Sequence, residues 1–109
     1  ALGNVTPVLA LPERPMLPAR SCDVIFVADT YHHFPDGPAY LGALAQALVP
    51  GGVLVNIDFF PEPLPIGPTP EHKVTRERFL KDAESAGFAL EGEEEFLAYQ
   101  YFLKLTRQR

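Results

Sequence analysis

Runs of apolar residues separated by glycine and proline mark out the elements of this chain. All five residues of 24–28 are apolar and most are β-branched, which is typical of a parallel strand covered on both faces. A second apolar run covers 53–57 and follows the turn signal of Gly51 and Gly52. We therefore predict two buried strands at 24–28 and 53–57.

A helix is predicted between these two strands. Apolar residues recur over 41–48 at the helical spacing i, i+3, i+4, i+7, with Asp36 placed to cap the first turn and Pro50 just beyond the end. A strand, a helix and a strand in this order form a β-α-β unit, whose crossover is right-handed in nearly all known cases. The two strands are therefore expected to run parallel.

The second half of the chain shows the pattern of a helix followed by two strands. Thr75 can cap a helix with an apolar stripe over 79–83, and Gly87 supplies the left-handed residue that commonly ends a helix. A strand is then expected to begin at 88–90, and 99–106 alternates apolar with other residues. This order predicts an antiparallel terminal pair.

The order of elements places the chain in the α/β class, with a parallel β-α-β core and a C-terminal antiparallel hairpin. A further short strand is expected at 5–9, at an edge because of Pro7. Ligands of open parallel sheets collect beyond the carboxyl ends of the strands, which selects 29–33 and 58–60. Five prolines between 61 and 70 predict a stiff loop that suits either a lid over a small apolar substrate or a packing surface.

Composition narrows the classes of partner. The chain has 109 residues, room for one small domain, and its net charge of -5 provides no basic surface for nucleic acid or a membrane. The single cysteine excludes an internal disulfide, and no apolar run approaches the ~20 residues of a membrane span. We expect a small-molecule ligand and a cytoplasmic location. Because the chain begins at Ala1 and its only methionine is Met16, we interpret it as a fragment, with any targeting signal upstream.

Three blocks of sequence resemble the second half of class I S-adenosylmethionine-dependent methyltransferases. They are DVIFVADTYHHF at 23–34, LVPGGVL at 48–54 and AGF at 86–88. In that family the first block is the fourth strand with its loop, the second introduces the fifth strand, and the third ends the last helix before the terminal hairpin. The resemblance implies a partial Rossmann-like methyltransferase fold, of which residues 1–109 are the C-terminal portion.

The cofactor-binding parts of that family are only partly matched. The stretch 4–18 resembles the third strand and the loop after it, where relatives often carry an acid that faces the adenine amino group. The matching position here is Leu11, with Glu13 two places later. Nothing before Asp23 contains the first strand with its Gly-x-Gly loop, or the acid that binds the ribose. Since only glycine lets the backbone approach that ligand closely, we expect this chain alone to bind S-adenosylmethionine poorly or not at all.

The resemblance also implies roles for the loop after the first strand. Asp29, Thr30 and Tyr31 would line the methionine portion of the cofactor, and His33 would face the substrate. A histidine of near-neutral pKa can take a proton from an oxygen, nitrogen or thiol acceptor. The alternatives are that His33 only bonds a backbone carbonyl and that Asp29 only supports a turn. His32 is expected to be structural.

A metal site is the weaker interpretation of the same edge. Ligand-type residues that fall near it are Asp29, His32, His33, Asp58 and His72. Adjacent histidines seldom bind one ion together, and the sequence has no helical His-x-x-x-His or Cys-x-x-Cys pair. We therefore expect no metal. Asp58 suits a structural turn at least as well as a site, and the acidic residues of 91–95 are expected to form a solvated face.

These observations favour S-adenosylmethionine-dependent methyl transfer to a small-molecule acceptor, in which the catalyst mainly aligns donor and acceptor. The alternative is a non-catalytic, degenerate or split methyltransferase half that acts in assembly with a second chain. A hydrolase is disfavoured because the sequence lacks a Gly-x-Ser-x-Gly elbow. Without neighbouring strands, 24–28 would keep an unpaired apolar edge, and self-association through that edge is expected.

Overall fold

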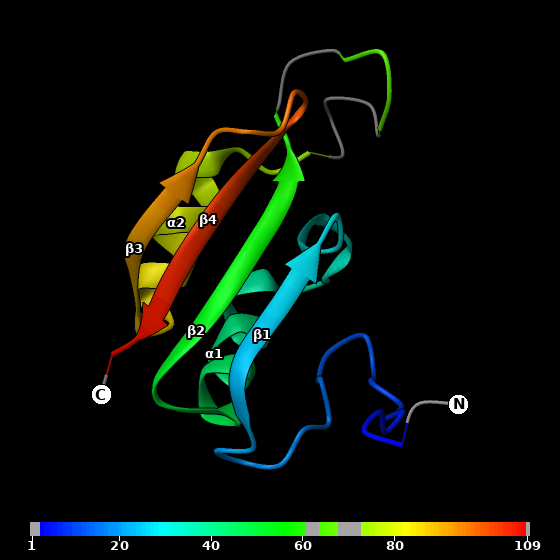
Figure 1. Ribbon diagram of the computed structural model, residues 1–109, viewed down its shortest axis with the longest axis vertical. Coiled ribbons are helices and arrows are strands. Elements are labelled where there is room, and N and C mark those ends of the chain that lie inside the picture. The colour runs from blue at the N-terminus through cyan, green and yellow to red at the C-terminus, as the bar shows by residue number, and fades with distance from the viewer. Residues whose placement is uncertain (1–2, 61–63, 68–72, 109) are drawn as a thin grey trace.

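One four-stranded sheet with two helices forms the body of the chain (Figure 1). The computed structural model describes residues 3–60, 64–67 and 73–108. The elements are β1 (Cys22–Ala28), the short 3-10 helix η1 (Tyr31–His33), α1 (Gly37–Ala47), β2 (Leu48–Phe59), α2 (Arg76–Ser85), β3 (Phe88–Glu94) and β4 (Gln100–Arg107). The strand order across the sheet is β1-β2-β4-β3.

The predicted β-α-β core and terminal hairpin are confirmed. Strands β1 and β2 are parallel, with Val24 opposite Val53 and Ala28 opposite Ile57, and α1 connects them. Strand β4 pairs antiparallel with both β2 and β3. Strand β2 begins earlier than predicted, because Leu48 directly after α1 already pairs with Cys22. The carboxyl ends of β1 and β2 consequently lie at the same edge of the sheet.

Both helices begin at the predicted caps. The Asp36 carboxylate accepts a hydrogen bond from the Ala39 amide, and the Thr75 hydroxyl accepts one from the Arg78 amide. Each bond satisfies an N–H group that the first helical turn leaves without an intrahelical partner. Gly87, with φ of +96°, follows the end of α2. The helices have 11 and 10 residues, and the described part of the chain contains no helix that meets the length and apolarity of a membrane span.

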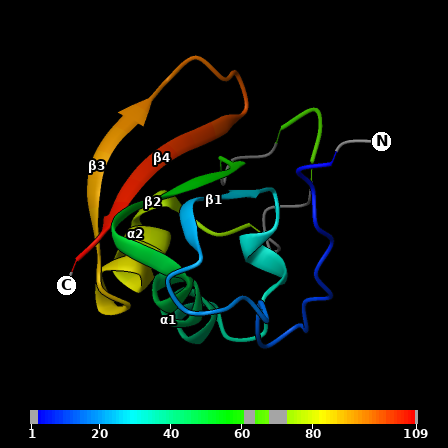
Figure 2. The ribbon, with the colours of Figure 1, turned by 60° about the horizontal axis from the view of Figure 1, so that its bottom comes forward.

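The core lies between the helices and one face of the sheet. Figures 1 and 2 show α1 and α2 side by side on that face. The side chains buried most completely come from both layers: Leu41, Leu48, Leu54, Phe79, Tyr101, Leu103 and Leu105. Burial of such side chains stabilises the fold by roughly 1.5–3 kcal/mol each before the entropy of ordering is subtracted.

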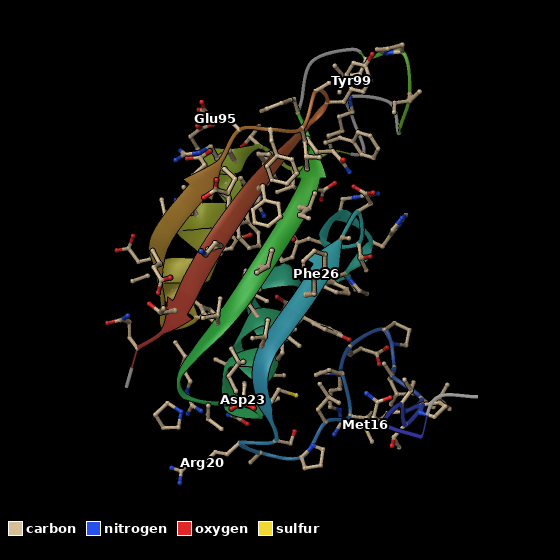
Figure 3. The ribbon with its side chains drawn as sticks, in the orientation of Figure 1. Met16, Arg20, Asp23, Phe26, Glu95 and Tyr99 are labelled. Carbon is tan, nitrogen blue, oxygen red and sulfur yellow. The ribbon has the colours of Figure 1, made fainter. Side chains whose placement is uncertain are left out.

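The opposite face of the sheet is open, so the prediction that β1 is covered on both faces is wrong. Val24 and Phe26 remain 59% and 60% exposed, since both helices pack on the other side. Figure 3 shows Phe26 on the side of the sheet turned away from the helices. Its ring lies 6.4 Å from that of Phe102, which in turn lies 5.4 Å from Phe96. We call these four residues the open-face patch.

The expected strand at 5–9 is not formed. Residues 5–9 have no strand pairing, and Pro7 cannot donate to a ladder. The segment is instead anchored further along, where the Arg20 and Ser21 amides donate to the carbonyls of Gln46 and Ala47 at the end of α1. In the described sheet β1 is therefore an edge strand.

A salt bridge between Arg76 and Glu93 connects α2 to β3. The Arg76 guanidinium donates two hydrogen bonds to the Glu93 carboxylate, at 2.8 and 2.6 Å. This pairing lowers the pKa of Glu93 below its ordinary value. The expected solvated face is thus interrupted at Glu93, whose side chain is only 27% exposed.

An unpaired strand edge beside an apolar patch predicts self-association of the isolated chain. Light scattering at increasing concentration should show a mass above that of the monomer. The double variant Val24→Lys, Phe26→Lys should return the chain to a monomer, because it places two charges on the open-face patch. The matched control Ala89→Lys changes an exposed residue of β3 and should leave association unchanged. A monodisperse wild-type monomer at high concentration would contradict the prediction.

Candidate functional site

The loops that follow β1 and β2 meet at one edge of the sheet. The Asp29 amide donates to the Ile57 carbonyl at 2.8 Å, so the first residue after β1 lies beside the end of β2. Asp58 follows Ile57 directly. The two regions selected from the sequence, 29–33 and 58–60, are therefore neighbours, as expected for the ligand edge of an open parallel sheet.

Asp29 adopts a backbone conformation that few residues tolerate. Its φ is +54°, in the left-handed region, where aspartate is found more often than most residues. Its carboxylate accepts a hydrogen bond from the side-chain amide of Gln100 on β4. Backbone strain of this kind gathers at ligand sites, and it also occurs in turns. The contact of Asp29 with a cofactor stays a prediction.

A buried carboxylate supports the first of the two histidines. Asp58 is 1% exposed, and its Oδ2 lies 3.4 Å from Nδ1 of His32, whose side chain is 6% exposed. The other carboxylate oxygen accepts a hydrogen bond from the Phe59 amide at 2.9 Å. Burial raises the pKa of Asp58 and the charge of Asp29 adds to the rise, while the Phe59 amide and His32 oppose it. His32 is therefore buried beside Asp58, and its expected structural role stays a prediction.

His33 is the exposed member of the pair. Its ring centroid lies 4.0 Å from that of His32, with the planes tilted by 43°. Its amide donates to the Thr30 carbonyl, which shapes η1. The three side chains Asp58, His32 and His33 thus lead from the protein interior to its surface. Such an order suits a substrate-facing His33, which remains a prediction.

The side chains of Thr30 and Tyr31 have different hydrogen-bond partners and point to different parts of the structure. The Thr30 hydroxyl donates to the Ala28 carbonyl at 2.7 Å, at the end of β1. The Tyr31 side chain is 4% exposed and its hydroxyl donates to Asp82 on α2 at 2.8 Å. Because the Tyr31 ring packs against the helices, only the backbone of Tyr31 is placed to contact a cofactor.

Two hollows flank residues 29–33, which we call the histidine loop. An apolar groove of about 270 Å³ runs along β1 and is lined by residues such as Leu17, Phe26, Ala28 and Thr30. Most of the side chains that line this groove are apolar. On the helix side, a smaller cavity of about 140 Å³ is lined in part by Tyr31, His32, Arg78 and Asp82.

The metal interpretation gains no support. The described residues hold no group of three or more histidine, cysteine, aspartate or glutamate side chains arranged for an ion. Of the five ligand types considered from the sequence, His72 lies outside the described residues.

Sequence reasoning missed two residues of this region. Gln100 belongs to an alternating strand, and its proximity to Asp29 arises only because β4 pairs with the end of β2, where Gln100 lies opposite Phe59. Asp82 is a charged residue on a helix that looks solvent-facing, yet it is 8% exposed. The one available signal was its i, i+4 spacing from Arg78, which contacts it at 3.3 Å.

Known methyltransferases resemble this chain in sequence and in structure. A family model described as a methyltransferase domain matches residues 3–56. No curated protein matches the sequence. A SAM dependent methyltransferase from Aquifex aeolicus aligns with a TM-score of 0.89 and 26% identity, covering 96% of this chain and 56% of that one.

Two further solved structures extend the likeness. A candidate type 11 methyltransferase from Sulfolobus solfataricus gives a TM-score of 0.79 at 23% identity, covering 93% of this chain and 57% of that one. An S-adenosylmethionine dependent methyltransferase from Mesorhizobium loti gives 0.72 at 19% identity, covering 90% and 67%. The resemblance to class I S-adenosylmethionine-dependent methyltransferases and the partial Rossmann-like fold are thereby confirmed. The chain spans 56% and 57% of the length of the first two structures.

The residues present fit only part of S-adenosylmethionine, the cofactor of that family. The groove along β1 and the loop 29–31 offer apolar and polar contacts at the ligand edge. Residues 3–60, 64–67 and 73–108 contain no Gly-x-Gly loop after a strand, which is the element that lets a backbone approach such a ligand. The assignment of residues 1–109 to the C-terminal portion of the domain stays a prediction.

The raised pKa of Asp58 predicts a pH-dependent stability effect. A carboxyl whose pKa is higher in the folded than in the unfolded chain stabilises the fold below its unfolded pKa, near the ordinary 3.8, and loses that contribution as the pH rises through the folded value. Asp58→Asn should therefore raise the free energy of unfolding at pH 7, since it removes a buried charge. The gain should shrink near pH 3.8, which urea unfolding at both pH values measures.

Asp23→Asn is the matched control for this comparison. Asp23 is exposed and lies at the other end of β1, as Figure 3 shows. Its replacement should leave the free energy of unfolding almost unchanged at both pH values. An Asp58→Asn variant less stable than the wild type at pH 7 would show that the hydrogen bonds of Asp58 outweigh the cost of burying its charge.

Proposed function

We propose that this chain forms the acceptor side of an S-adenosylmethionine-dependent methyltransferase, and that the complete protein methylates a small molecule. The observation that carries this proposal is the order of Asp58, His32 and His33, from buried to exposed, at the carboxyl ends of β1 and β2. The family match over residues 3–56 supports the same reaction class.

The residues of this chain would act mainly by alignment. S-adenosylmethionine, when bound, supplies an electrophilic methyl group on a sulfonium. Asp29, Thr30 and the backbone of Tyr31 would border its methionine end, and the groove along β1 would receive an apolar part. Holding donor and acceptor in line and excluding water is worth roughly 7–11 kcal/mol in favourable cases.

Proton removal is the second contribution. His33 would accept the proton of an oxygen, nitrogen or thiol acceptor as the acceptor atom attacks the methyl group. Such proton transfer raises the rate about a hundredfold. The imidazolium formed at His33 would lie beside His32, whose other neighbour is the carboxylate of Asp58.

The fold does not determine the reaction by itself. A cyclase has the same fold as this chain, with a TM-score of 0.73 at 10% identity. The alternative function, a non-catalytic half that acts in assembly, also remains compatible with an open sheet face. A test must therefore measure cofactor binding and methyl transfer directly.

The isolated chain should bind S-adenosylmethionine more weakly than about 1 mM, because its residues include neither the glycine-rich loop nor the ribose-binding acid of that family. Isothermal titration calorimetry of the chain with S-adenosylmethionine measures this affinity. Micromolar binding would show that the residues described above hold the cofactor without those parts.

A completed domain should regain binding and catalysis. The part of the Aquifex aeolicus structure that does not align with this chain, joined to it, provides such a domain, since the two folds superpose with a TM-score of 0.89. In it, His33→Ala should lower kcat about a hundredfold and abolish the fall of kcat at acidic pH that protonation of a general base causes, with cofactor affinity unchanged. The exposed-site control Glu84→Ala should behave as the unsubstituted chimera.

Two outcomes would contradict this account. A folded chimera that binds no S-adenosylmethionine would remove the proposed reaction and favour the assembly alternative. A chimera in which His33→Ala retains full kcat would remove His33 from proton transfer.

A further inference from the structure

Tyr31 is the point at which the histidine loop is fixed to both helices. Its ring meets Phe79 of α2 edge-on at 4.9 Å and Phe34 edge-on at 5.8 Å. Its hydroxyl donates to Asp82 of α2 at 2.8 Å. Three contacts from one buried side chain leave the ring little freedom to turn.

The start of α1 is fitted to the same side chain. A Cβ at Gly37 would lie 2.2 Å from the Tyr31 hydroxyl oxygen, so only glycine leaves room for the phenol here. Phe34, which packs on Tyr31, also stacks on Tyr40 of α1 at 3.8 Å. The position of Tyr31 is thus specified by α1 as well as by α2.

The orientation of Tyr31 decides where the histidines face. A 3-10 helix has three residues per turn, so successive residues of η1 start about 120° apart around its axis, and the rings of His32 and His33 then approach to 4.0 Å. With Tyr31 directed toward the helices, His32 is directed to Asp58 and His33 to the surface. A rotation of η1 that released Tyr31 would also separate His32 from Asp58.

Asp82 completes this arrangement from α2. Its carboxylate is held by the Tyr31 hydroxyl and by Nε of Arg78, which lies 3.3 and 3.4 Å from its two oxygens. Burial and the neighbouring Asp82 raise the pKa of Tyr31 well above its ordinary value, so the phenol keeps its proton and stays a donor. Tyr31, His32, Arg78 and Asp82 also line the same 140 Å³ cavity.

We propose that Tyr31 and Asp82 are positioning residues, whose buried hydrogen bond couples α2 to the orientation of His32 against Asp58. Neither residue touches the reacting groups in this account; both act through His32 and the adjacent His33. The catalytic meaning of the coupling rests on the proposed function, whereas the orientation of His32 is a property of this chain alone.

Nitrogen-15 chemical shifts of the imidazole rings report the orientation directly. At pH 8, where an ordinary imidazole is neutral, wild-type His32 should hold one tautomer with its Nδ1 proton directed to Asp58. Tyr31→Phe removes only the hydroxyl and should give His32 the averaged shifts of two mixed tautomers. His33, already exposed, should change little.

Tyr40→Phe is the matched control. Tyr40 is also buried, at 7% exposed, and among the described residues its hydroxyl has no hydrogen-bond partner. Both variants remove the hydroxyl of a buried tyrosine, but the proposal predicts a change of His32 tautomer only for Tyr31→Phe, because only the Tyr31 hydroxyl bonds Asp82. Asp82→Leu should reproduce the Tyr31→Phe shifts, and the double variant should add nothing further, because both remove the same bond.

The proposal is overturned if His32 keeps a single tautomer in Tyr31→Phe and Asp82→Leu, or if Tyr40→Phe disturbs it equally. In the completed domain, Tyr31→Phe should lower kcat by up to about a hundredfold at unchanged KM, as expected for misplaced groups. A chimera that transfers no methyl group would refute the proposed function, while the tautomer measurement would still decide the coupling.

Discussion

Parallel pairing of β1 with β2 is the constraint on which the rest of the structure depends. Because the two strands run in the same direction, both end at one edge of the sheet. Residues 29 sequence positions apart become neighbours there. The crossover helix α1 lies on the face that α2 also covers. Those helices then receive Tyr31, and the turn that follows β1 sets His32 on Asp58. Without the parallel pairing, the turn after β1 would not lie beside the end of β2.

The site edge is built at some cost to stability. Asp58 is a carboxylate buried where its charge is disfavoured, and Asp29 occupies a backbone region that most residues avoid. Both are adjacent to the strand ends at which this fold binds ligands. The open-face patch and the edge of β1 add exposed apolar surface. The chain spans 56% of the length of a similar methyltransferase.

Much of the fold was predictable because its signals are local. The apolar runs, the caps Asp36 and Thr75 and the glycine after α2 each depend on neighbours within one turn of helix or one strand. Exposure of Val24 and Phe26 was not predictable, because an apolar residue has the same sequence signature whether or not a helix covers it. The contacts of Gln100 and Asp82 join residues 71 and 51 positions apart, so they follow only from the sheet order and the helix packing.

Backbone proximity between β1 and β2 tests the central claim most directly. Nuclear Overhauser effects in the isolated chain should join Val24 to Val53 and Ala28 to Ile57, with the intervening residues connected in the same order along both strands. That pattern defines a parallel pair with its two loops at one edge. Contacts that run in the opposite order, with Val24 beside the end of β2, would place Asp29 and Asp58 at opposite rims and contradict the site described above.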